Sequence, residues 1–163
     1  MPPIISIVGE SKSGKTTLIE KLISEFKSKG YRVATIKHSV HGLNFDTPGK
    51  DSWRHIKAGG AATVIVSPDQ VVLIKPVSAQ PDLNEIARLF GEDYDIILAE
   101  GFKQSQAPKV EVHRKAAGPL LNHINNLVAI ATDEPLESSI RQFSLNDIKG
   151  LADFLERDFI KPK

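Results

Sequence analysis

The feature that most constrains this chain is a phosphate-loop pattern placed between a predicted strand and a predicted helix. Residues 9–16, GESKSGKT, match G-x-x-x-x-G-K-[S/T] at every position. Mostly β-branched apolar residues at 4–8 precede the pattern, and apolar residues at helical spacing follow from Thr16. This context favours a true phosphate-binding loop over the alternative, a glycine-rich turn with a surface lysine. The chain is therefore predicted to begin with a strand, a phosphate-binding loop and a helix.

The remaining pattern alternates strands with helices. Strands are predicted at 31–36, 95–100, 110–113 and 127–131, and helices at 51–58 and 83–90. A final amphipathic helix is predicted to start with a capping-box-like Ser144 and Asp147. Runs at 61–66 and 70–75 flank a turn and predict an antiparallel hairpin attached to the parallel sheet. We expect an α/β fold, namely a P-loop NTPase three-layer sandwich with a mostly parallel sheet and an added hairpin, in one nucleotide-binding domain over 1–163.

Composition narrows the class of partner. The 163 residues carry 21 Lys and Arg against 20 Asp and Glu, so there is no global field that would draw the protein onto nucleic acid or a membrane. The absence of cysteine excludes disulfides, thiolate zinc sites and a cysteine nucleophile. The N-terminal apolar run is too short for a secretory signal or a membrane span. We expect a cytoplasmic protein that binds neither nucleic acid nor membrane.

The phosphate loop predicts the contacts of a nucleotide and its metal ion. Glycines let backbone N–H groups turn toward phosphates, and the following helix directs the positive end of its dipole at them. Lys15 is expected to reach the β- and γ-phosphates, and the Thr16 hydroxyl to ligate Mg²⁺. The nucleotide-binding residues predicted in this segment are Gly9, Glu10, Ser11, Lys12, Ser13, Gly14, Lys15, Thr16 and Thr17.

Two acidic residues are candidates for the metal site beside Thr16. Glu100 follows a buried apolar run, so it should emerge at the carboxyl end of the sheet, where open α/β sheets bind ligands. The alternative is a glutamate exposed at a strand end. Asp46 is the second candidate and lies in the irregular polar segment 37–52. Its alternative role is an ordinary Asx turn before Thr47 and Pro48.

The end of the run at 127–131 bears on the choice of base. Thr132 and Asp133 follow this predicted strand, where a carboxylate can accept hydrogen bonds from guanine N1–H and N2–H₂. Adenine would place an acceptor opposite the same carboxylate, which is costly when the pair is buried. Thr132 and Asp133 therefore predict a preference for GTP. The alternative is a turn-forming aspartate before Glu134 and Pro135.

Histidines and scattered cations give weaker signals. His38 and His41, with Asp46, have the ligand types of a transition-metal site, but their irregular spacing and the lysine before His38 favour ordinary side chains. Several cations are expected in or near loops at the sheet ends, where together they favour an anionic ligand although each alone is an ordinary surface residue. These are Lys37, Lys50, Arg54, Lys103, Lys109 and Arg114.

Five segments together resemble one family. They are GESKSGKTT at 9–17, IKHSVHGLNFDTPGKDS at 36–52, AEGFK at 99–103, PKVEVHR at 108–114 and ATD at 131–133. Over nearly the whole chain this set resembles the molybdopterin-guanine dinucleotide biosynthesis protein B family. The resemblance implies a homodimeric GTP-binding protein with weak Mg²⁺-dependent GTPase activity that assists the molybdopterin guanylyltransferase, with molybdopterin as a further candidate ligand. It implies phosphate contacts at 9–17, metal contacts near Thr16 and Glu100, and a guanine contact near Thr132 and Asp133.

Two alternatives to a GTP-binding accessory protein remain at this point. A small-molecule P-loop kinase would close an arginine-bearing lid over the phosphates, but the six arginines include no close pair. A nucleotide-gated binding module without turnover stays open, because no residue stands out as the one that orients an attacking water. Slow hydrolysis at most is expected. The edge of the predicted hairpin would leave backbone groups unpaired, which favours pairing across a two-fold axis in a homodimer.

Overall fold

The computed structural model describes residues 1–39, 42 and 45–160, and the chain separates into two compact units. The first unit comprises Met1–His38 and Asp82–Lys163, and the second comprises Ser39–Pro81. The candidate His41 lies outside the described residues. The single nucleotide-binding domain expected over 1–163 stays a prediction, and each unit is described by itself.

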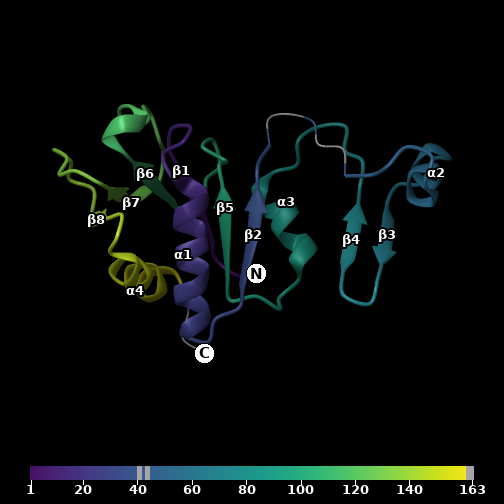
Figure 1. Cartoon of the computed structure of the whole chain (residues 1–163), viewed down its shortest axis with the longest axis horizontal. Coiled ribbons are helices and arrows are strands. Elements are labelled where there is room, and N and C mark those ends of the chain that lie inside the picture. The colour runs from purple at the N-terminus through teal and green to yellow at the C-terminus, as the bar shows by residue number, and fades with distance from the viewer. Residues whose placement is uncertain (40–41, 43–44, 161–163) are drawn as a thin grey trace. The chain divides into compact units, whose positions relative to one another are not determined.

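A parallel sheet of six strands forms the centre of the first unit (Figure 1). The strand order is β2-β5-β1-β6-β7-β8, and every neighbouring pair is parallel. The strand β1, which leads into the phosphate loop, therefore lies between β5 and β6. The strands are β1 (Ile4–Val8), β2 (Val33–Lys37), β5 (Ile96–Glu100), β6 (Lys109–His113), β7 (Leu127–Thr132) and β8 (Gln142–Ser144).

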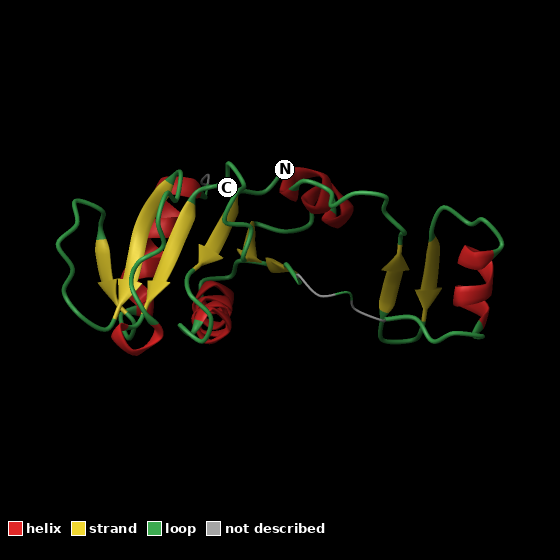
Figure 2. Cartoon of the chain, turned by 90° about the horizontal axis from the view of Figure 1, so that it is seen from above, coloured by secondary structure: helices red, strands yellow, loops and turns green. Residues whose placement is uncertain are grey.

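Helices cover both faces of this sheet. Leu22 and Phe26 of α1 share a buried core with Leu155 of α4 on one face. Leu83 and Ala87 of α3 bury the other face, and Figure 2 shows α1 and α3 on opposite sides of the strands. The expected three-layer α/β sandwich of a P-loop NTPase is confirmed. The helices of this unit are α1 (Lys15–Ser28), α3 (Leu83–Ala87), the short 3-10 helices η1 (Arg88–Phe90) and η2 (Lys115–Ala117), and α4 (Ile148–Phe159).

The strand β6 differs from its neighbours because it buries charged side chains. Val110 and Val112 face the core beneath α1 and α4, whereas Lys109, Glu111 and His113 alternate with them and are also buried. Lys109 was expected among cations that favour an anionic ligand, and this expectation is wrong. Its ammonium group donates to the carbonyls of residues 105 and 107 and to the amide oxygen of residue 125. All three of its N–H groups are therefore used inside the protein.

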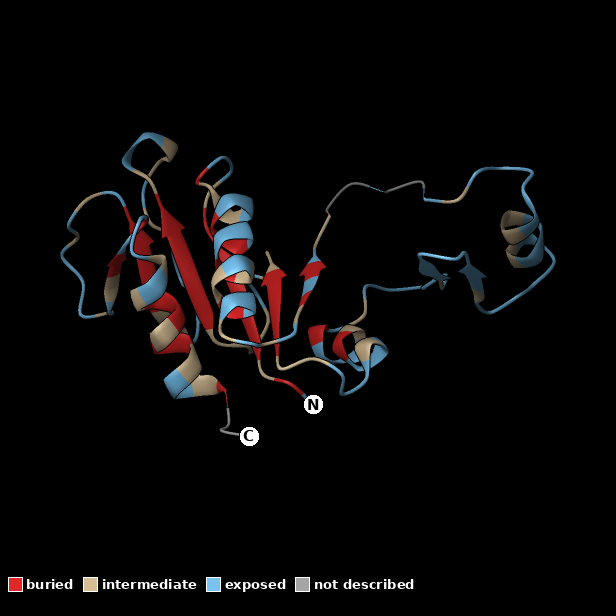
Figure 3. Cartoon of the chain, turned by 60° about the horizontal axis from the view of Figure 1, so that its bottom comes forward, coloured by how far each residue is buried: buried red, intermediate tan, exposed pale blue. Residues whose placement is uncertain are grey.

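The second unit holds the predicted helix and hairpin. Its elements are α2 (Asp51–Lys57), β3 (Thr63–Val66) and β4 (Val71–Ile74), and β3 and β4 pair antiparallel. The hairpin is confirmed, but its expected attachment to the parallel sheet is wrong, because β3 and β4 form a two-stranded sheet of their own. Most side chains of both strands are exposed, as Figure 3 shows. The sequence pattern identified the pairing and did not determine which sheet it would join.

The last helix begins later than the capping pattern indicated. Asp147 is the N-cap residue of α4, and its side chain accepts a hydrogen bond from the Gly150 N–H at 3.0 Å. Ser144 instead ends β8, a strand that the sequence pattern did not predict. Among the described residues, no helix is long and apolar enough to cross a membrane.

Candidate functional site

The loop between β1 and α1 has a backbone that requires glycine at two positions. Gly9 has φ 148°, and a Cβ there would lie 2.5 Å from the carbonyl oxygen of Val112 on β6. Gly14 has φ 101° and is the N-cap residue of α1, without a side-chain cap. The first N–H groups of α1 therefore donate to no capping side chain. Such a helix N-terminus favours an anion.

Lys15 folds back over this loop. Its ammonium group donates to the carbonyl oxygens of Gly9 at 3.2 Å and Glu10 at 2.7 Å. Partial burial lowers the pKa of Lys15, and the nearby Glu100 carboxylate opposes this effect. Phosphate oxygens would be stronger acceptors for this ammonium than the neutral carbonyls that it contacts.

Thr16 and Glu100 come together as the sequence predicted. The Thr16 hydroxyl lies 3.1 Å from both carboxylate oxygens of Glu100, and Lys37 Nζ lies 2.9 Å from Oε1. The pairing of β1 with β5 brings these residues together, because Glu100 ends β5 next to the start of α1. The Glu100 side chain is only 15% exposed, so it is not a free glutamate at a strand end.

The oxygen atoms of Thr16 and Glu100 suit a hard cation such as Mg²⁺. Mg²⁺ is usually held by one or two protein oxygens together with phosphate oxygens and water. Among the described residues, no group of three or more His, Asp and Glu side chains that could hold a metal ion occurs. Asp46, the second candidate ligand, belongs to the second unit, where its Oδ1 accepts a hydrogen bond from the Ser52 hydroxyl at 2.8 Å. Its metal role stays a prediction.

His38 follows β2 and lies against Phe102. The two ring centroids are 5.1 Å apart. The backbone N–H of His38 donates to the backbone carbonyl of Glu100 at 3.1 Å. These contacts give His38 a packing role at the end of the sheet.

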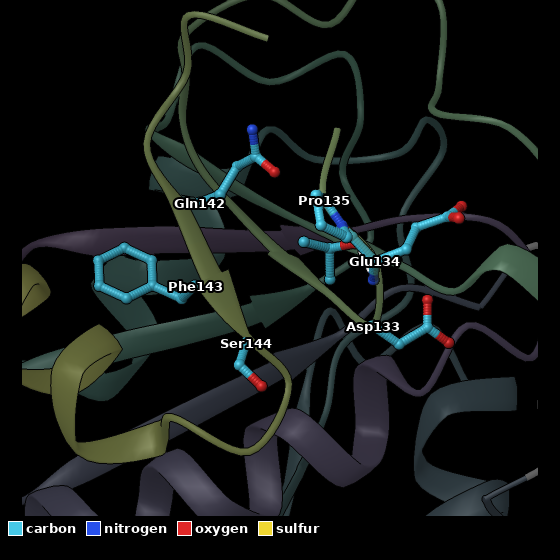
Figure 4. A pocket seen from close by; sticks show the side chains of 7 residues that line it. Asp133, Glu134, Pro135, Gln142, Phe143 and Ser144 are labelled. Atoms are coloured by element: carbon cyan, nitrogen blue, oxygen red, sulfur yellow. Dashed lines mark hydrogen bonds between the residues drawn. The ribbon is translucent and has the colours of Figure 1, made fainter. Parts of the chain in front are cut away.

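Thr132 and Asp133 lie at the edge of a shallow pocket of about 280 Å³ between the ends of β7 and β8. In Figure 4, the Phe143 ring lies on the opposite side of the β8 ribbon from Asp133, Glu134 and Pro135. The volume is slightly below the range of pockets that enclose drug-sized ligands, so it suits part of a ligand, such as a base. The pocket is lined by Thr132, Asp133, Glu134, Pro135, Gln142, Phe143 and Ser144.

Both candidate base contacts also serve the local turn. Asp133 Oδ1 accepts a hydrogen bond from the Lys115 N–H at 2.9 Å, and the Thr132 hydroxyl bonds to the backbone of Glu134. The turn-forming alternative is therefore present in the structure. It does not exclude base binding, since Asp133 Oδ2 accepts no hydrogen bond from a described residue. The assignment of Thr132 and Asp133 to guanine stays a prediction.

Arg114 is the residue whose position the sequence did not indicate. The sequence placed it among scattered cations, yet its Nε donates to the Ser13 carbonyl of the phosphate loop at 2.9 Å. The signal was its place directly after a strand, but only the pairing of β6 with β1 brings it to the loop. Ser144 was missed as a pocket residue because β8 has only three residues.

Comparison with known proteins identifies the family of this chain. The family model described as molybdopterin guanine dinucleotide synthesis protein B matches residues 4–133. The chain is similar to the molybdopterin-guanine dinucleotide biosynthesis adapter protein of Haemophilus influenzae, with 38% identity over 94% of this chain and 88% of that protein. It is also similar to the Escherichia coli protein of the same name, with 36% identity over 95% of this chain and 92% of the relative.

Solved structures agree with the sequence comparison. A crystal structure of molybdopterin-guanine biosynthesis protein B matches with a TM-score of 0.74 and 30% identity, covering 94% of this chain and 98% of that one. A homolog from Bacillus stearothermophilus matches with a TM-score of 0.70 and 28% identity, covering 96% and 97%. Because the family model, the relatives and the fold agree over most of its length, this chain belongs to the molybdopterin guanine dinucleotide synthesis protein B (MobB) family.

Proposed function

We propose that this protein is a GTP-binding adapter in molybdenum cofactor biosynthesis, which assists the formation of molybdopterin guanine dinucleotide. The contact of the Thr16 hydroxyl with the Glu100 carboxylate carries the nucleotide part of the proposal, because it provides oxygen ligands for Mg²⁺ beside an uncapped helix N-terminus. The adapter role is supported by the names of the relatives.

GTP rather than ATP is the proposed nucleotide. The pocket between β7 and β8 offers the Asp133 carboxylate at its rim, and a carboxylate accepts from the two donors of guanine. Hydrolysis is slow, so the protein is a weak Mg²⁺-dependent GTPase at most. No feature of the described residues favours the small-molecule kinase, and the relatives are named as adapter proteins.

The proposed partners are the molybdopterin guanylyltransferase, molybdopterin itself as a candidate ligand, and a second copy of this chain. The exposed apolar side chains of β3 and β4 support the homodimer, because a second copy can cover them and pair with a free strand edge. A cytoplasmic location remains our expectation from the sequence.

Calorimetric titration with GTP tests the nucleotide site. We expect Mg²⁺ to tighten GTP binding to the wild-type protein, and ATP to bind more weakly than GTP. Glu100→Gln should lose most of the tightening by Mg²⁺ and keep the affinity measured in its absence. Glu20→Gln, on the exposed side of α1, is the matched control and should behave as wild type. GTP affinity that is the same with and without Mg²⁺ in the wild-type protein would contradict the proposed site.

A further inference from the structure

Arg114 is a cation with an unusual position, because it lies against the phosphate loop. Its Nε donates to the Ser13 carbonyl at 2.9 Å, and no carboxylate pairs with it among the residues that the structure describes. A Cβ built on Gly14 would lie 3.2 Å from Nε and 3.5 Å from Nη2 of Arg114. The guanidinium group is therefore packed beside Gly14, the N-cap residue of α1.

Arg114 adds positive charge to the end of the sheet that holds the phosphate loop. Its guanidinium group lies beside the uncapped N-terminus of α1. Burial is the main cause that lowers the pKa of Lys15, Lys103 and Lys37 lower it further, and Glu100 and Glu10 oppose this effect. A helix N-terminus and a guanidinium group both favour a bound anion. Because Nε is already bonded to Ser13, the four N–H bonds of Nη1 and Nη2 remain for a ligand in a fixed orientation.

The strand order indicates which part of a nucleotide Arg114 would meet. Glu100 ends β5 on one side of β1, whereas Arg114 follows β6 on the other side. Beyond β6 comes β7, which ends at the Thr132 and Asp133 pocket proposed for the base. Arg114 thus lies between the phosphate loop and that pocket, on the side away from the proposed metal ligand. In a nucleotide, the group between the terminal phosphates and the base is the α-phosphate with its ribose.

We propose that Arg114 binds the α-phosphate of the nucleotide and is a phosphate-binding residue in addition to the phosphate loop. This inference rests on the proposed function, because it assumes a nucleotide that spans the loop and the β7–β8 pocket. It assigns to Arg114 a contact that GDP and GTP share. The contact does not depend on the γ-phosphate or on Mg²⁺.

Binding of GDP and GTP to variants of the full chain tests the proposal. Arg114→Ala should weaken both nucleotides by the same factor of at least ten, and Arg114→Lys should cause a smaller loss, because lysine keeps the charge without the planar fork. Arg88→Ala, in the exposed part of η1, makes the same change of net charge and should leave both affinities unchanged. ³¹P NMR of bound GDP adds a readout of the contact itself. The α-phosphorus resonance should move in Arg114→Lys, while the β-phosphorus resonance keeps its wild-type position.

The outcomes separate this inference from the proposed function. If the wild-type protein binds neither nucleotide, the proposed function fails and the inference fails with it. If the wild-type protein binds both and Arg114→Ala matches it, the inference alone is overturned. A loss confined to GTP would place Arg114 at the γ-phosphate and also overturn it. Movement of both phosphorus resonances would show that Arg114 only holds the shape of the loop through Ser13.

Discussion

At the scale of single residues, the site depends on atoms whose present partners are weaker than the ligands proposed for them. Lys15 donates to two neutral carbonyls of its own loop, and the Thr16 hydroxyl donates to a carboxylate that is itself a metal-ligand type. A Mg²⁺-bound nucleotide would offer charged phosphate oxygens to the Lys15 ammonium and the metal ion to the Thr16 hydroxyl. Substitution of these side chains should therefore weaken the binding of the nucleotide and its metal ion.

Lys15→Ala is expected to lower the affinity for Mg²⁺-GTP by at least tenfold, about 1.4 kcal/mol, because it removes the ammonium that folds over the phosphate loop. The fold should persist, since within the described part of the chain the Lys15 ammonium donates only to carbonyls of its own loop. Equilibrium titration measures the affinity, and circular dichroism checks the fold. Lys21→Ala on the exposed side of α1 removes the same charge and serves as control. An unchanged dissociation constant in Lys15→Ala would remove the phosphate-loop interpretation.

Asp133→Asn is expected to shift the preference from GTP toward xanthine nucleotide. The amide can donate to the C2 carbonyl of xanthine, whereas the carboxylate accepts from the N2 amino group of guanine. The Asn oxygen can still accept from the Lys115 N–H, so the local turn should be retained. Competition among GTP, ATP and XTP measures the shift. If wild-type protein binds ATP as tightly as GTP, Asp133 is a turn residue only.

Glu111 is the buried carboxylate whose Oε1 accepts from the Leu121 N–H at 2.6 Å and whose Oε2 has no partner among the described atoms. Burial raises the pKa of Glu111. Since the acid is harder to ionise in the folded state, the free energy of unfolding falls as pH rises from the unfolded glutamate pKa of about 4.3 to the raised folded value. Above the folded value, the cost stays constant.

Glu111→Gln is therefore expected to raise the free energy of unfolding near neutral pH, on the order of 1 kcal/mol, because it replaces a buried carboxylate, one of whose oxygens has no partner among the described atoms, with a neutral amide. The gain should disappear below the ordinary glutamate pKa, where both side chains are neutral. Urea unfolding near neutral pH and below the ordinary glutamate pKa measures this gain in the free energy of unfolding. The exposed Glu137→Gln serves as control. A gain of the same size at both pH values would show that the pKa of Glu111 is not raised in the folded protein.

At the scale of elements, prediction from sequence succeeded where the signal was local. Residues 4–28 showed the period change from strand to helix around an unbroken motif, and the structure has β1 and α1 there. Glu100 was placed correctly because an acid directly after a buried strand must lie at the sheet end. The site residues themselves stay predictions where only a ligand would reveal their role.

Prediction failed where the outcome depended on which elements are neighbours. Lys109, Glu111 and His113 alternate with valines, which is typical of a strand with one solvent face. In the structure, however, residue 121 of the next connection donates to Glu111, and residue 125 accepts from Lys109. That connection has no period from which its packing could be predicted. Arg114 was indistinguishable from a surface cation, because the sequence does not state that β6 pairs with β1.

The hairpin of the second unit carries the prediction for assembly. Ile65 on β3 and Val72 on β4 are directly paired, and both are exposed, at 41% and 39%. The double variant Ile65→Lys/Val72→Lys places two like charges opposite each other on one face, which should prevent a second copy from covering it. Sedimentation equilibrium at tens of micromolar should show a dimer for the wild-type protein and a monomer for the variant.

Leu89→Lys, at an exposed leucine of the first unit, is the control for this assembly and should remain dimeric. A wild-type protein that sediments only as a monomer would refute the homodimer. A double variant that remains dimeric would place the interface elsewhere on the chain.

At the scale of the whole molecule, we expect the affinity of the proposed adapter for its partner enzyme to depend on GTP. Binding linkage makes this reciprocal, so GTP must tighten partner binding by the same factor by which the partner tightens GTP binding. A nucleotide that binds the partner-bound and the partner-free protein equally does not change the affinity for the partner, however tightly it binds. The coupling therefore distinguishes an adapter that uses GTP from a protein that binds GTP and its partner independently.

The most direct test of this claim is the affinity of the protein for the molybdopterin guanylyltransferase, measured with Mg²⁺-GTP, with Mg²⁺-GDP and without nucleotide. Lys15→Ala is included in all three conditions to show that any effect passes through the phosphate loop. We expect the tightest binding with Mg²⁺-GTP in the wild-type protein and no effect of nucleotide in Lys15→Ala. Equal wild-type affinities in the three conditions would contradict this expectation, because the nucleotide would then have no influence on the partner.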